Sequence, residues 1–204
     1  MNVGRVFSPT VRRATAASLV VAGCALGACS AQPDDTAASP TGPELASTTP
    51  PAAEQPAADE GLPFDTLPMI PAGREDFTDC PYLDTTFVAD TNGQKVTGQG
   101  IDTRFDTPAC VFWSYPEEPQ LTVLVRHMHT PQQAKEVVDW AAPVDATSPA
   151  SEPQGWDGGR GSLGPESSVY AVFKDTVAVV VFSNQQQSIK PQLVAEKAIE
   201  NLGL

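Results

Sequence analysis

His127 and His129 are the only two histidines in the chain, and they lie two residues apart. On a β-strand, residues i and i+2 point to the same side, so both imidazoles could reach one metal ion. Two ligands do not make a metal site, and the sequence has neither an HExxH motif nor a third histidine. The pair is therefore a weak metal candidate, and the simpler interpretation is a polar strand end that leaves the core.

A hydrolase nucleophile is not indicated either. The nucleophile elbow has the form Gly-x-Ser-x-Gly, whereas residues 161–164 read Gly-Ser-Leu-Gly. A Ser-His-Asp arrangement also needs a suitably placed histidine, and the chain has few. We therefore predict a non-enzymatic protein without catalytic residues or a cofactor.

The glycine-rich segment 155–161 is the other stretch that invites a chemical interpretation. It lacks the Lys-Ser/Thr pair of phosphate loops and the spaced acids of calcium loops, so it favours a flexible turn. Trp156 in such a turn could stack on a sugar or insert into a partner, or it could instead cap the edge of the core. Trp156, Asp157 and Arg160 are thus speculative binding residues.

The first 29 residues have the form of a lipoprotein signal peptide. Arg12 and Arg13 form a basic region, and residues 14–28 form an apolar core too short to span a bilayer as a stable helix. The sequence Leu-Gly-Ala-Cys-Ser at 26–30 resembles the lipobox of bacterial lipoproteins, which implies acylation, for example by palmitate, at Cys29. Cys24 is the alternative. We expect a lipid anchor in the cell membrane and an extracytoplasmic domain.

Residues 30–70 contain seven acidic and no basic residues and are rich in Ala, Pro and Thr. Such a segment cannot bury enough apolar surface to fold, so we predict a disordered linker. Its last part, 62–70, is apolar enough to dock onto the domain or to lead into the first element. The net charge of −13 without a Lys/Arg cluster argues against a nucleic-acid partner.

Apart from an acylated anchor cysteine, Cys80 and Cys110 are the cysteines that remain after export. Disulfides persist outside the cytoplasm, so we predict a bond between them. On the chain-entropy estimate, closing this loop stabilises the fold by about 3.5 kcal/mol. No second cysteine lies at a redox or metal-binding spacing.

The first half of the domain predicts one helix and three antiparallel strands. Asp79 can cap the helix, which has Pro81 near its start and ends before Asn92-Gly93. Aromatic and β-branched residues, separated by turn residues, predict the strands that follow. These are a weak or edge strand at 94–105, a strand at 110–115, a hairpin turn at 116–119 and a central strand at 121–129.

The second half predicts a helix, a long loop, a strand pair and a final helix. Thr130-Pro131-Gln132-Gln133 is typical of a helix start, and the buried face is predicted to hold Ala134, Val137, Val138 and Ala141. Then come a loop at 142–165, strands at 168–174 and 177–183, and a helix from Ser188 with a predicted buried face of Ile189, Leu193, Val194, Ala198, Ile199 and Leu202.

Together these elements predict one α+β domain over residues 71–204. We expect a twisted, mostly antiparallel sheet of about five strands, with helices packed mainly on one face and one disulfide.

Three segments carry a family resemblance: Cys-Pro-Tyr-Leu at 80–83, Ala-Cys-Val-Phe-Trp-Ser-Tyr at 109–115 and Leu-Thr-Val-Leu-Val-Arg at 121–126, with a Gly-rich edge between the first two. The pattern resembles the actinobacterial secreted or lipoprotein domain of unknown function numbered twenty-twenty in its naming series. The resemblance covers about residues 75–204. It implies a cell-envelope lipoprotein domain and no catalytic residues.

We therefore expect a membrane-anchored envelope lipoprotein with a binding or accessory domain. Its sheet or its 142–165 loop would face a protein, a glycan or a lipid. One alternative is a metal-dependent envelope hydrolase that uses His127, His129 and a carboxylate. Another is a purely structural surface protein.

Overall fold

The computed structural model describes Asp59 and residues 61–204. The predictions on the signal peptide, on Cys24 and Cys29, and on most of the linker lie outside these residues.

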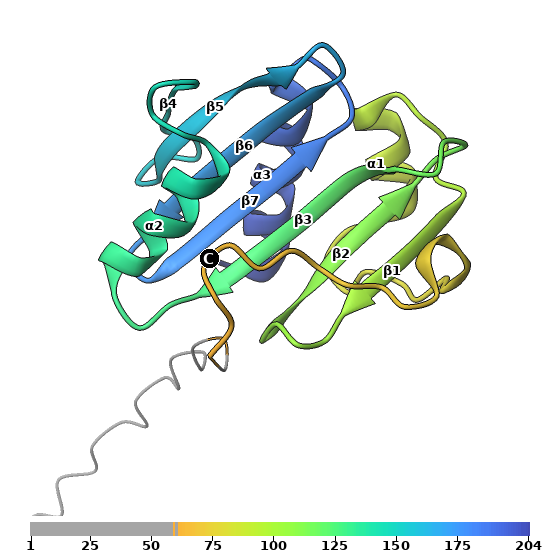
Figure 1. Ribbon diagram of the computed structural model, residues 1–204, viewed down its shortest axis with the longest axis horizontal. Helices are drawn as coiled ribbons and strands as arrows, with labels where there is room; N and C mark the ends of the chain where they lie inside the picture. Colours follow the sequence, from red (N-terminus) through yellow and green to blue (C-terminus); the bar gives the residue numbers. More distant parts are fainter. Residues whose placement is uncertain (1–58, 60) are drawn as a thin grey trace, which may run out of the picture. The chain divides into compact units, whose positions relative to one another are not determined.

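The domain is built on one seven-stranded antiparallel sheet with the strand order β1-β2-β3-β7-β6-β5-β4 (Figure 1). The strands are β1 Gly98–Asp102, β2 Thr107–Trp113, β3 Pro119–His127, β4 Ser148–Ala150, β5 Asp157–Gly164, β6 Ser167–Lys174 and β7 Val177–Ser183. The predicted α+β class and antiparallel sheet are confirmed, but the expected number of about five strands is wrong.

The two extra strands, β4 and β5, lie within the predicted loop 142–165. Gly158 and Gly159 are typical of a turn, but in the fold they allow β5 to lie close to β6 and to Thr147. A Cβ on Gly158 would lie 2.0 Å from the carbonyl oxygen of Ala171 on β6, and one on Gly159 would lie 2.8 Å from Thr147 Oγ1. The glycines therefore let the β4–β5 edge pack closely, a role that local turn propensity does not reveal.

Gly158→Ala is expected to lower the free energy of unfolding by about 2 kcal/mol, because β5 must shift to relieve the backbone clash. Gly161→Ala in the same strand is the matched control, since its Cβ would meet nothing closer than 3.3 Å. Urea unfolding of both variants measures the difference. Equal unfolding midpoints would show that the β5–β6 spacing is not constrained at Gly158.

The helices α1 Thr85–Asn92, α2 Pro131–Ala141 and α3 Ile189–Leu202 lie on both faces of the sheet. In Figure 1, α2 lies in front of the sheet and α3 behind it. Both pack on β6 and β7, and α1 contacts α3. The expectation that helices lie mainly on one face thus holds for α1 and α3 but not for α2.

The alternation of side chains along β6 and β7 explains this arrangement. One set of residues packs in the core with α3, and the alternate set packs in a second core with α2. The α3 side buries Tyr170, Val172, Val179 and Val181, and the α2 side buries Val169, Ala171, Ala178 and Val180. A sheet that is apolar on both faces requires cover on both.

The start of α1 differs from the prediction, because Asp84 and not Asp79 is its N-cap. The Asp84 carboxylate accepts hydrogen bonds from the backbone N–H groups of Thr86 (2.8 Å) and Phe87 (3.1 Å), and these bonds lower its pKa. The preceding segment is held elsewhere: the disulfide joins Cys80 to β2, and the Tyr82 hydroxyl donates to the carbonyl of Pro108. Because these contacts hold the segment before Asp84, α1 begins only at Thr85.

The predicted disulfide between Cys80 and Cys110 is confirmed, with Cα atoms 5.7 Å apart. The start of α2 is also confirmed, with Thr130 Oγ1 accepting a hydrogen bond from the Gln133 N–H at 3.2 Å. In α3, Val194, Ala198 and Ile199 are buried as predicted. Ile189 and Leu193 are instead 49% and 45% exposed, whereas Pro191 and Ala195 of the same helix are buried.

The folded part begins earlier than the predicted boundary at residue 71. We call Asp59 and residues 61–75 the strap. In Figure 1 it crosses the front of β3 and β2 and reaches β1. It ends in the 3₁₀ turn η1 Gly73–Glu75. The apolar segment 62–70 therefore docks onto the domain, one of the two possibilities that its sequence allowed.

Candidate functional site

The two histidines do not form a metal site with other residues. His127 is buried at the end of β3, with Nε2 2.9 Å from Thr107 Oγ1, whereas His129 is exposed beyond the strand. Burial lowers the pKa of His127, although Asp59 and Asp106 act in the opposite direction. Across Asp59 and residues 61–204, no three His, Cys, Asp or Glu side chains gather closely enough to hold a metal ion.

Trp156 is a core residue and does not project from a mobile loop. It is 4% exposed and packs in the core on the α3 side of the sheet. It also lines a cavity of about 420 Å³ with Ile199 and Leu204, where the Lys174 Nζ lies 5.8 Å from its ring centroid. Of the two interpretations of Trp156, the core-edge role is the one that the structure shows.

The other two speculative binding residues point to different places. Arg160 Nη1 donates to Gln192 Oε1 on α3. Asp157 lines a separate cavity together with residues of α2. Since alternate residues of a strand face opposite sides, Trp156 and Arg160 cannot share a site with Asp157.

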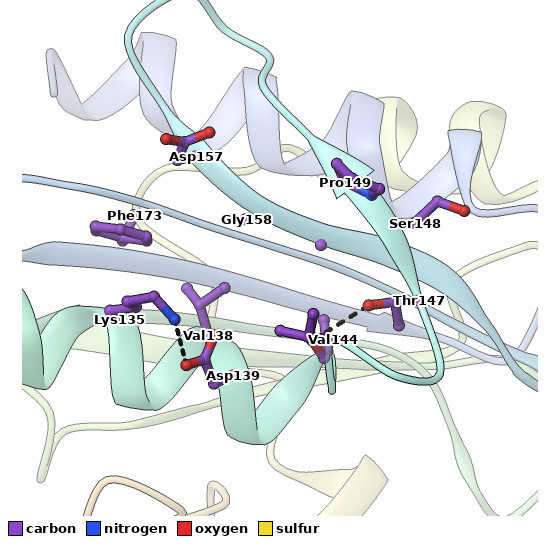
Figure 2. Close-up of a pocket in the computed structure, with 12 residues that line it drawn as sticks. Lys135, Val138, Asp139, Val144, Thr147, Ser148, Pro149, Asp157, Gly158 and Phe173 are labelled. Atoms are coloured by element: carbon purple, nitrogen blue, oxygen red, sulfur yellow. Dashed lines mark hydrogen bonds and ion pairs between the residues drawn. The ribbon is translucent and has the colours of Figure 1, made fainter.

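The cavity beside Asp157 lies between α2 and the strands β4 and β5 and has a volume of about 260 Å³. Figure 2 shows Lys135 and Asp139 paired on the helix and Asp157 on the strand across from them. Thr147 Oγ1 donates to the carbonyl of Pro143 at 2.8 Å. Most of these polar groups already bond to one another, so the cavity does not present a set of groups for a ligand.

A second surface is more open and almost wholly apolar. We call it the apolar cleft; it has a volume of about 510 Å³ and is lined by Leu67, Thr122, Trp140, Ala141, Pro143, Leu163 and Phe182. The rings of Trp140 and Phe182 meet edge to face, with centroids 6.0 Å apart. Leu67 and Leu163 are 54% and 44% exposed. Apolar side chains left open in this way are typical of binding surfaces.

Five parts of the chain position the cleft. Thr122 on β3 and Phe182 on β7 are cross-strand partners and form the floor. Trp140 projects from α2, three residues after the buried Val137. Leu163 comes from the end of β5, and Leu67 comes from the strap. None of these was predicted as a site residue, although Trp140 beside the apolar stripe of α2 is a local signal that could have identified one wall.

The lining of the cleft is poor in reactive groups. Its lining has one hydroxyl, from Thr122, and no titratable group. Its volume lies within the range of small ligand sites, about 300–1,000 Å³. The cleft can therefore hold one or two large apolar side chains.

Within the described part of the chain, no helix is both long and apolar enough to cross a membrane. A comparison with curated proteins found no match. A family model does match, over residues 62–204, and the match takes in the disulfide, all seven strands and nearly all of the strap. The resemblance drawn from the Cys-Pro-Tyr-Leu and Ala-Cys-Val-Phe-Trp segments is thereby confirmed, and the chain belongs to the family described as Domain of unknown function (DUF2020).

Proposed function

We propose that this protein is a lipid-anchored lipoprotein of the cell envelope whose domain binds an apolar segment of another envelope protein, without catalysis. The apolar cleft is the observation that carries the binding role. The basic and apolar regions before Cys29 and the lipobox-like residues 26–30 support the anchor.

The openness of the cleft favours a protein segment over a carried lipid. Leu67 and Leu163 stay about half exposed at its walls. An alkyl chain placed there would keep much of its surface in water, and each methylene gains about 0.8 kcal/mol only when it is fully buried. A large side chain on a protein segment can fill the floor at Phe182, while the rest of the segment covers the rim.

The net charge of the domain indicates what kind of protein segment the cleft would bind. Residues 61–204 hold nine Lys or Arg against 19 Asp or Glu. Four carboxylates lie within three residues, along the chain, of a lining residue, and one of them is paired with Lys135: Asp65, Asp145 and Glu166, and the paired Asp139. The net negative charge of the domain repels anionic lipid headgroups and attracts Lys and Arg. The partner is therefore a segment with large apolar side chains flanked by basic residues.

Two labelled peptides with the same Leu and Phe residues, one flanked by Lys and one by Glu, test this on the purified protein by fluorescence anisotropy. The Lys-flanked peptide should bind more tightly, and Leu163→Ser should weaken it about fivefold through the lost apolar contact. Ile189→Ser on α3 is the control, because Ile189 is similarly exposed and does not line the cleft. Equal losses in both variants, or tighter binding of the Glu-flanked peptide, would contradict the proposal.

The anchor is tested separately in the cells that produce the protein. Cys29→Ala should abolish incorporation of labelled palmitate and release the protein from the membrane fraction, whereas Cys24→Ala should retain both. The opposite pattern would place the lipid on Cys24. Absence of labelled palmitate from the natural chain and from both variants would refute the anchor and leave the cleft unaffected.

A further inference from the structure

The first part of the strap is held mainly by one buried arginine. Asp59 also donates its N–H to the His127 carbonyl at 2.9 Å and accepts the Asp106 N–H at 3.1 Å. Arg126 is 1% exposed, and its Nε donates to the carboxylate of Asp59. Its Nη atoms donate to the carbonyls of Leu62 (3.2 Å), Pro63 (3.1 Å) and Phe64 (3.1 Å). The fork geometry of a guanidinium suits this set of acceptors, so Arg126 fixes the path of the strap where the chain enters the domain.

The rest of the strap is held at three further points, one of which is the Leu67 carbonyl, which accepts a hydrogen bond from Arg104 Nη2 at 3.4 Å. The Met69 N–H donates to Asp102 Oδ2 at 2.8 Å, and Arg74 donates to the carbonyls of Ser114 and Pro116 at the turn between β2 and β3. Desolvation alone would raise the pKa of Asp102, but bonds from Arg104 and Met69 outweigh it and leave the pKa lowered. Polar contacts at discrete points therefore fasten the strap.

Between these points the strap is loosely packed. Residues 61–72 form turns but no helix or strand, and Pro63, Pro68 and Pro71 each lack a backbone N–H donor. The side chains of Phe64, Leu67 and Met69 are each more than two-fifths exposed. Segments with few buried apolar contacts open locally at a lower free energy than the core does.

Leu67 stands between two cavities. On one side is the apolar cleft. On the other is a smaller cavity of about 200 Å³, lined by Leu67, Pro68, Ile70, Val111, Trp113, Pro119 and Thr122. Both cavities include Thr122 on β3. The strap therefore divides one apolar region of the sheet into two compartments.

We infer that the strap is an autoinhibitory cover of the binding cleft, released as a unit when the contact between Asp59 and Arg126 opens. Release removes Leu67 and joins the two compartments into one groove over β2, β3 and β7. The closed cleft admits one or two side chains, whereas the open groove admits a longer segment. This rests on the proposed binding role of the cleft and adds its regulation.

The test uses Asp59→Asn in the full chain, with Glu200→Gln as a control that makes the same charge change in the exposed pair with Lys197. Hydrogen exchange of the Met69 amide reports strap release, because its acceptor Asp102 lies on β1. Fluorescence of the dye ANS reports the joined groove. We expect exchange at Met69 about tenfold faster and brighter ANS fluorescence in Asp59→Asn, with neither change in Glu200→Gln.

Leu67→Ala tests the role of Leu67 between the two cavities separately from the role of the contact between Asp59 and Arg126. It should brighten ANS fluorescence, because it joins the compartments, and leave Met69 exchange unchanged. The inference is overturned if Asp59→Asn leaves Met69 exchange unchanged or accelerates exchange equally in β3, β6 and β7, since the strap would then not open as a unit. Neither readout needs the partner peptide, so failure of peptide binding and failure of the strap release can be told apart.

Discussion

Trp156→Ala is expected to lower the free energy of unfolding by about 4 kcal/mol, the typical cost of replacing a buried aromatic residue with alanine. Trp156 is 4% exposed and shares its core with Tyr170 and Ile199. The Tyr170 hydroxyl donates to the carbonyl of Glu152 just before the tryptophan, and burial raises the pKa of Tyr170 to about 12. Losing the indole would leave a cavity beside this buried group. Denaturant unfolding followed by far-UV circular dichroism measures the change.

Asp157→Ala is the control for Trp156, because Asp157 is exposed and adjacent. It should change stability by no more than about 0.5 kcal/mol. If Trp156→Ala folded with unchanged stability and lost affinity for a glycan or protein ligand instead, the tryptophan would be a binding residue after all.

Loss of the disulfide is expected to cost about 3.5 kcal/mol, because the unfolded chain regains the freedom of a loop that joins residues 30 apart. The double variant Cys80→Ala, Cys110→Ala tests this by its urea midpoint. In the native fold, Cys80 ties the start of α1 to β2, and Asn201 of α3 donates to the nearby carbonyl of Tyr82 at 2.8 Å. Opening the bond should therefore also loosen the packing of α1 against α3.

A reducing agent distinguishes the bond from side effects of the substitutions. It should destabilise the natural chain by a similar amount and leave the double variant unchanged. A loss of less than about 1 kcal/mol in both experiments would mean that hydrogen bonds and packing alone hold this corner.

Much of the apolar cleft could not be predicted, although two of the segments that form it have recognisable sequence patterns. The sequence predicts the apolar stripe of α2 and an apolar segment at 62–70 that is able to dock. Trp140 and Leu67 nevertheless come together only through the strap, and the strap depends on the buried Arg126. In the sequence, Arg126 is one polar residue at the end of an apolar strand. Its role requires acceptors about 60 residues away.

The elements whose signals are local could be predicted from the sequence alone. The cap at Thr130 and Pro131, the strands rich in valine and aromatic residues, the pairing of Cys80 with Cys110 and the family all follow from nearby residues or from cysteine count. These signals work because capping, alternation and turn chemistry act within a few residues.

Other features depend on neighbours that are distant in the chain, and local sequence patterns do not predict them. Gly158 and Gly159 belong to a strand because β6 and Thr147 lie against them. α2 covers the second face because β6 and β7 are apolar on both sides. The cleft joins five segments that lack a common local pattern. Long-range packing sets each of these features, and its free energy overrides local propensity.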